Sequence, residues 1–207
     1  FMPAELVGTP MIAIALCHVG EMEEGETLVQ PLRAVAPAAA DVLGPHPYVQ
    51  LQRMFDASAP AGIHAYWKAE YLDDLNDTVI ELLIDGARSL RSPFSAIHVH
   101  QLGGAVERAP AGDTAFAHRS PAYVVNLLAQ WMDPGEDAGH VEGVRRLWKE
   151  VRPHASGDAY LNFMDADDAS RIETAYGEDR FRRLVDLKRR YDPDNLFRLN
   201  QNIPPEA

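Results

Sequence analysis

The strand-like and helix-like segments of this sequence do not follow one another in strict alternation. Apolar or alternating patterns predict strands at 10–19, 65–72, 94–102, 123–131 and 160–164. Patterns with one apolar stripe predict helices at 48–55, 77–90, 139–151, 168–175 and 179–190, and a helix broken by prolines at 23–40. A regular strand–helix–strand order would build a parallel sheet, so this order favours an α+β fold with an antiparallel sheet covered by helices.

The composition is that of an ordinary globular protein and excludes several function classes. The 207 residues carry a formal net charge of -12, and no dense Lys/Arg run lies outside 180–190, so we expect no nucleic-acid partner. Cys17 is the only cysteine, which rules out an internal disulfide and a cysteine-based metal site. The longest apolar run, 11–16, is too short to span a bilayer, and no signal peptide is visible. We therefore expect a cytoplasmic protein with no membrane partner.

Two histidines lie two residues apart in the predicted strand 94–102. His98 and His100 should share one face of that strand, because strand side chains alternate. Such a pair can bind a metal, but no further ligand is tied to it by sequence, so we expect no metal. The pair could equally be satisfied sheet histidines or substrate contacts.

A second candidate is the segment 157–165, which places Tyr160 and Asn162 on one face of a predicted strand. Polar side chains on an inner strand need partners. One interpretation is a half-buried core tyrosine with a bonded hydroxyl; the other is a functional phenol. The nearby Asp165, Asp167 and Asp168 lack the glycine and glutamate of a calcium loop, so we predict that they cap the next helix.

Three further features bear on a binding site. Trp67 belongs to an aromatic strand that packs in the core or forms a pocket wall, and Gln52 lies on a short amphipathic helix that could reach a pocket. Near the C-terminus, the Asp-Pro turn at 192–193 must end the preceding helix. The extended segment after it carries Asn200 and Gln201, uncharged donors and acceptors suited to a cofactor or to backbone groups.

Three segments together, 100–119, 157–165 and 188–203, resemble the C-terminal half of FAD-linked oxidases of the berberine-bridge-enzyme type. The resemblance implies that Tyr160 faces a flavin and acts as the base, and that Asn162 lies against the cofactor. It implies further cofactor contacts from Asn200 and Gln201. It also makes the sheet the floor of a substrate pocket, with contacts from His98, His100, Gln52 and Trp67.

One position departs from that family pattern. A catalytic glutamate follows the Gly-Gly pair in berberine-bridge-type members, but here that position is Arg108, with Glu107 beside it. Neighbouring strand residues point to opposite faces, so Glu107 is no automatic replacement. The departure disfavours ring closure at an amine and leaves tyrosine-based oxidation of an alcohol or sugar.

The N-terminal, FAD-binding half of the family has no counterpart in these residues, which contain no glycine-rich pyrophosphate loop. The resemblance implies a substrate-binding domain at 1–160 and a berberine-bridge-type C-terminal segment at 161–207. We expect the substrate-binding half of an FAD-dependent oxidoreductase, inactive by itself. Its partners would be a small-molecule substrate and an FAD-binding domain, in cis or as a separate chain. The alternative is a stand-alone domain that lost flavin and binds a small molecule or a protein.

Overall fold

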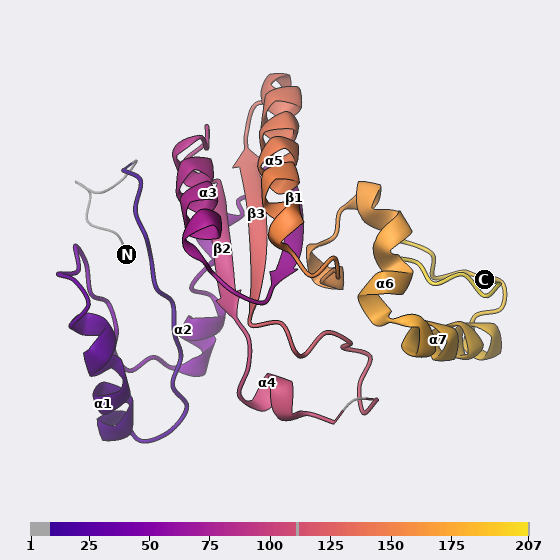
Figure 1. The fold of residues 1–207 in the computed structure, drawn as a ribbon, viewed down its shortest axis with the longest axis horizontal. Helices are drawn as coiled ribbons and strands as arrows, with labels where there is room; N and C mark the ends of the chain where they lie inside the picture. The colour runs from indigo at the N-terminus through magenta and orange to yellow at the C-terminus, as the bar shows by residue number, and fades with distance from the viewer. Residues whose placement is uncertain (1–8, 111, 207) are drawn as a thin grey trace. The chain divides into compact units, whose positions relative to one another are not determined.

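A computed structural model describes residues 9–110 and 112–206 of the chain (Figure 1). They divide into two compact units, residues 1–61 and 62–207, each considered by itself. The division falls inside the predicted domain 1–160, and the predicted boundary at 160 stays a prediction.

The first unit contains helices α1 (Met22–Arg33) and α2 (Tyr48–Gln52) and the 3-10 turn η2 (Asp56–Ser58). The helix predicted at 23–40 continues through Pro31 and ends at Arg33. Arg33 then pairs with Glu26 and Asp41, at 2.7 Å in each case, and ties the helix to the chain that follows it. The helix predicted at 48–55 is shorter than expected.

The strand predicted at 10–19 is wrong. These residues form no strand, and Ile12 and Val19 are 90% and 92% exposed. An apolar run predicts burial, but a strand also needs a neighbour for its backbone hydrogen bonds. All strands among the described residues lie in the second unit.

The second unit is built on an antiparallel sheet of β1 (His64–Leu72), β2 (Ala96–Gln101) and β3 (Tyr123–Trp131). The strand order is β1-β3-β2, so β3 is central and pairs with both neighbours. All three strands were predicted, β3 with its observed ends. This sheet with its helices confirms the α+β fold.

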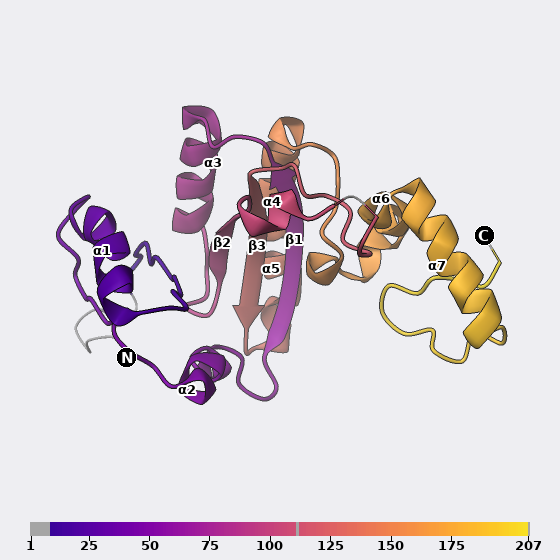
Figure 2. The ribbon, with the colours of Figure 1, turned by 90° about the horizontal axis from the view of Figure 1, so that it is seen from below.

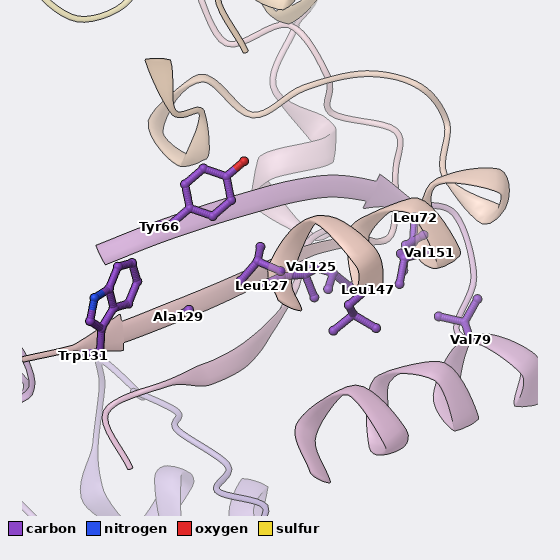
Figure 3. Close-up of a cluster of buried hydrophobic side chains, with 10 residues drawn as sticks. Tyr66, Leu72, Val79, Val125, Leu127, Ala129, Trp131, Leu147 and Val151 are labelled. Atoms are coloured by element: carbon purple, nitrogen blue, oxygen red, sulfur yellow. The ribbon is translucent and has the colours of Figure 1, made fainter. Parts of the chain in front are cut away.

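Two helices cover one face of the sheet, α3 (Asp77–Arg88) and α5 (Asp137–Val151). The Asn76 side chain accepts a hydrogen bond from the Val79 backbone N–H at 3.2 Å and so caps the start of α3. Alternate residues of β3 point toward these helices. Figure 3 shows the resulting core, whose buried members include Leu72, Val79, Val125, Leu127, Trp131, Leu147 and Val151.

The remaining elements are α4 (Ala105–Arg108), η3 (Pro134–Glu136), η4 (Arg152–His154), η5 (Leu161–Phe163), η6 (Ala166–Arg171), α6 (Ile172–Tyr176) and α7 (Glu178–Tyr191). Of these, α4 follows β2, η3 follows β3, and the others follow α5 along the chain. After α7 the chain turns back along that helix (Figure 2), where Arg189 Nε donates to the Pro205 carbonyl at 2.7 Å.

Three local predictions need correction. The segment 160–164 is not a strand: the Phe163 N–H donates to the Tyr160 carbonyl at 2.9 Å and closes the 3-10 turn η5. The helix predicted at 168–175 is the 3-10 turn η6 followed by the short helix α6. Glu107 and Arg108 lie in α4, so strand alternation does not separate their side chains.

Candidate functional site

The face of the sheet away from α3 and α5 carries most of the predicted substrate contacts. Because side chains alternate, Trp67 of β1 shares this face with His98 and His100 of β2. In the register of the sheet, His98 lies opposite Asn126 of the central strand, and Trp67 lies opposite the next residue on that face, Leu128. No Asp, Glu, Lys or Arg side chain of the described strands lies on this face, which does carry the two histidines.

The two histidines are in contact and have lowered basicity. Their rings meet edge to face, with centroids 5.9 Å apart. Loss of solvation, and then the neighbouring His100, lower the pKa of His98, and loss of solvation lowers the pKa of His100. Both rings are therefore neutral at neutral pH, and each offers one donor and one acceptor nitrogen.

Two buried polar atoms on this face have no hydrogen-bond partner among the described residues. They are the indole N–H of Trp67 and the amide oxygen Oδ1 of Asn126. Since buried polar atoms are nearly always hydrogen-bonded, this donor and this acceptor are suited to bind a polar group on this face.

Tyr160 reaches the same face through a cluster of aromatic rings. It packs edge-on against Phe163 at 4.9 Å, Phe116 at 5.9 Å and Tyr71 at 6.3 Å between centroids. Phe163 in turn contacts His100 at 5.4 Å. The structure thus brings Tyr160 and the histidine pair together, although they come from distant parts of the chain.

Asn162 lies beside Tyr160, as the sequence predicted, although on a turn and not on a strand. Its Nδ2 donates to the Tyr160 hydroxyl oxygen at 3.0 Å. Tyr160 is only half-buried, whereas Tyr71 is fully buried. Burial first, and then Tyr160 and Asp158, raise the pKa of Tyr71 strongly, so Tyr71 keeps its proton.

The C-terminal segment approaches this loop through Gln201. Its Nε2 donates to the Met164 carbonyl at 2.8 Å, two residues beyond Asn162. Asn200 is exposed and has a positive φ of 59°, which Asn tolerates better than most residues. Within the described residues, Oδ1 of Asn195 and Oδ1 of Asn202 are buried and unpartnered.

Gln52 is exposed on α2 of the first unit. Its predicted substrate contact stays a prediction, because the two units are described separately.

The sequence analysis missed a group of charged residues on the helix-covered side of β1. Lys68 and Glu70 point to the helix-covered side of β1 and are 3% and 2% exposed. Lys68 Nζ lies 2.5 Å from Asp167 and 2.8 Å from Asp168, and Glu70 pairs with Arg171 at 3.0 Å. Two charges in the middle of a strand with apolar flanks are a visible signal, because buried charges need partners.

Asp167 and Asp168 therefore act mainly as ion-pair partners of the sheet. Asp168 does accept the Asp165 backbone N–H at 3.2 Å, which is the local bonding that the capping prediction implied. The prediction missed the lysine on the strand.

Neither a metal cluster nor a membrane span is found in the part of the chain that the structure describes. That part contains no group of three or more His, Cys, Asp or Glu side chains that could hold a metal ion. No helix there is both long and apolar enough to cross a bilayer.

The chain is similar to known proteins. The family model described as "Berberine and berberine like" matches residues 159–204, the stretch from the Tyr160 loop to the C-terminal segment. An FAD-linked oxidoreductase from Dictyostelium discoideum is 28% identical over 198 residues, covering 94% of this chain and 42% of the relative. The chain is thus similar to FAD-linked oxidoreductases, and its C-terminal part to the berberine and berberine-like family.

Two solved structures share the fold of this chain. BBE-like 1 from Physcomitrella patens matches with a TM-score of 0.73 and 24% identity, covering 91% of this chain and 43% of that protein. 6-Hydroxy-D-nicotine oxidase from Arthrobacter nicotinovorans matches with a TM-score of 0.72 and 23% identity, covering 91% and 43%. The chain thus spans about two fifths of the length of the relatives it matches.

Proposed function

We propose that this chain is the substrate-binding part of an FAD-dependent oxidoreductase that oxidises a small alcohol, sugar or secondary metabolite by hydride transfer to flavin. The observation that carries the proposal is the meeting of Tyr160, Asn162 and the histidine pair beside one sheet face. The unpartnered Trp67 N–H and Asn126 Oδ1 on that face supply a donor and an acceptor for a substrate.

The residues near the C-terminal segment fit a flavin. A flavin ring presents carbonyl acceptors and an N–H donor, which suit amide side chains. We assign cofactor contacts to Asn162, Asn200 and Gln201. The buried, unpartnered Oδ1 of Asn202 lies in the same segment and supports this assignment, because it lacks a donor among the described residues.

An exposed apolar stretch supports docking of an FAD-binding part, in cis or as a separate chain. Leu196, Phe197 and Leu199 are 76%, 78% and 85% exposed. A contiguous apolar surface of this kind marks an interaction site. When bound, FAD would accept the hydride that the substrate loses.

The residues of this chain would bind the substrate and take its proton. The neutral His98 and His100 and the indole of Trp67 would orient a hydroxyl-bearing substrate. Tyr160, as the phenolate, would take the hydroxyl proton, and the Asn162 amide, already aimed at the phenolic oxygen, would stabilise the negative charge that this oxygen carries before the transfer.

The test is Tyr160→Phe in the assembled flavoenzyme, which is this chain together with its FAD-binding part. Loss of a general base lowers turnover by about 10²- to 10⁴-fold. We expect a fall in that range with an unchanged flavin absorption band. Tyr176→Phe is the matched control, because Tyr176 is a half-buried tyrosine of α6 outside the aromatic cluster. Full turnover of Tyr160→Phe would reject the base assignment.

The mass and visible spectrum of the protein from its natural source test the broader proposal. A flavin band on a protein about twice the 22.9 kDa of this chain, or on a complex of two chains, supports it. A 22.9 kDa protein without flavin would favour a stand-alone binding domain.

A further inference from the structure

Resting on the proposed function, we infer that the buried pair Glu70–Arg171 positions Tyr160 for proton transfer. The rings that pack against Tyr160 are Tyr71, Phe116 and Phe163, so the pair acts through the loop that carries the tyrosine. Both residues are positioning residues in this sense.

Arg171 fixes the start of that loop. Its Nη2 donates to the Asp158 carbonyl at 2.8 Å and lies 3.4 Å from the Gly157 carbonyl. The same nitrogen lies 3.0 Å from Glu70 Oε2, in the centre of β1. Tyr160 follows Asp158 by two residues, so the guanidinium links the sheet to the backbone just before the tyrosine.

Glu70 is held in turn by α5. The indole N–H of Trp148 donates to Glu70 Oε1 at 2.7 Å, so both carboxylate oxygens are engaged. The side chain of Glu70 is 1% exposed and that of Arg171 is 13% exposed. A rigid strand and a packed helix thus set the place of the guanidinium.

The far side of the loop is fixed by other residues. Lys68 binds Asp167 and Asp168 beyond Tyr160, and His118 Nδ1 lies 3.0 Å from the Asp158 carboxylate. Of these anchors, Arg171 is the one that binds backbone carbonyls beside the tyrosine.

Stability alone does not explain the pair. Burial raises the pKa of Glu70, and Arg171 and Trp148 offset this only in part. The charged carboxylate is therefore less favourable in the folded protein than in water. Buried ion pairs can often be replaced by uncharged groups of similar size without loss of stability. What an uncharged pair cannot supply is the charged Nη2 group that donates both to the Asp158 carbonyl and to the Glu70 carboxylate.

The experiment separates positioning from folding in the assembled flavoenzyme. The double variant Glu70→Gln/Arg171→Met keeps an acceptor for Trp148, removes both charges and removes the Nη2 donor. We expect an unfolding temperature close to that of the parent. A misplacement of about 1 Å can cost on the order of 100-fold in rate, so we expect a loss of that size in substrate-driven flavin reduction at saturating substrate, with little change in substrate affinity.

Controls keep the outcomes distinct. Arg182→Met removes an exposed pair with Glu178 on α7 and should leave the reduction rate unchanged. Parental reduction by a folded double variant would overturn the inference. If the double variant does not fold, Arg171→Lys is used, because lysine keeps the charge beside Glu70 but lacks the planar guanidinium group. A slowed Arg171→Lys supports positioning, and an unaffected one overturns it.

Tyr160→Phe is measured alongside. If it reduces flavin at the parental rate, the proposed base fails and the inference falls with it. If it is slow while the double variant is fast, the inference about Glu70 and Arg171 fails alone.

Discussion

A single carboxylate, that of Asp167, joins three side chains from β1 and α5. It accepts hydrogen bonds from Lys68 at 2.5 Å, from Tyr66 at 2.7 Å and from Arg145 at 2.8 Å. Partial burial would raise its pKa, but these three donors outweigh burial and lower the pKa of Asp167 from 3.8 to about 2.

This lowered pKa gives a prediction for acid stability. A carboxylate whose pKa is depressed in the folded state stabilises the fold above its unfolded pKa, and this stabilisation is lost as the pH falls through the folded value. We therefore expect the contribution of Asp167 to disappear between about pH 4 and pH 2, measured as the difference in free energy of unfolding between the parent and Asp167→Asn. The difference should be small, because the side chain is 37% exposed and solvent screens it.

Asp179→Asn is the matched control, since the Asp179 side chain is 94% exposed beside Arg182. Its stability should follow the parent across the same pH range. A gap between the parent and Asp167→Asn that persists unchanged to pH 2 would contradict the prediction.

For single residues, the sequence predicted which side chains lie close together better than it predicted the backbone conformation that brings them together. Tyr160 and Asn162 lie together as expected, yet the alternation argument used the wrong geometry, because the 3-10 turn also brings residues two apart within reach. The partners of Lys68 could not be predicted, because Asp167 lies about a hundred residues further along the chain. Local patterns carry no information on such a pairing.

At the scale of elements, α3 and α5 approach each other over a glycine. A Cβ added at Gly86 would lie 2.5 Å from Leu147 Cδ2, whereas one added at Gly143 of α5 meets nothing within 4 Å. Both glycines lie in helices, so the difference between the two positions is the space available for a side chain.

Gly86→Ala and Gly143→Ala should therefore shift stability in opposite directions. Overpacking costs about 1–3 kcal/mol, so we expect Gly86→Ala to lower the free energy of unfolding by that amount. Alanine at a free helical site stabilises by about 0.4–1 kcal/mol, so Gly143→Ala should raise it. Urea unfolding of both variants measures the difference. Equal effects would show that the contact with Leu147 relaxes without cost.

The elements that the sequence predicted best are those that have both a clear pattern and a local boundary signal. Helix α3 has an apolar stripe and the Asn76 cap, and β3 is an apolar run of strand length. Residues 10–19 have an apolar pattern of the same kind but no strand beside them. Composition indicates that a segment can be buried, but whether a partner strand lies beside it depends on tertiary structure.

At the scale of the whole molecule, the apolar segment after α7 is a surface without a partner among the described residues. Phe197 is 78% exposed, although its backbone is fixed: its N–H donates to Asp192 at 3.0 Å and its carbonyl accepts from Lys188 at 2.6 Å. The segment is thus held in one conformation while its side chains face solvent.

Phe197→Ser should make the separately expressed chain less prone to self-association and should weaken its assembly with the FAD-binding part. Burying a phenylalanine side chain is worth about 1.5–3 kcal/mol, so affinity should fall by roughly one to two orders of magnitude. Titration calorimetry or flavin retention measures this. Met132→Ser, which removes an apolar side chain 49% exposed after β3, is the control. Unchanged assembly of Phe197→Ser would place the contact elsewhere.

The strand order β1-β3-β2 also determines when the sheet can form during synthesis. Both outer strands leave the ribosome before the central one, and neither pairs with the other. Their backbone N–H and C=O groups cannot form the hydrogen bonds of the sheet until β3 has been synthesised to residue 131. Until then the apolar side chains of β1 are exposed to other chains. Contacts between distant residues slow folding. The nascent chain is therefore most prone to aggregate, and most in need of a chaperone, in the period that ends when β3 inserts between its neighbours.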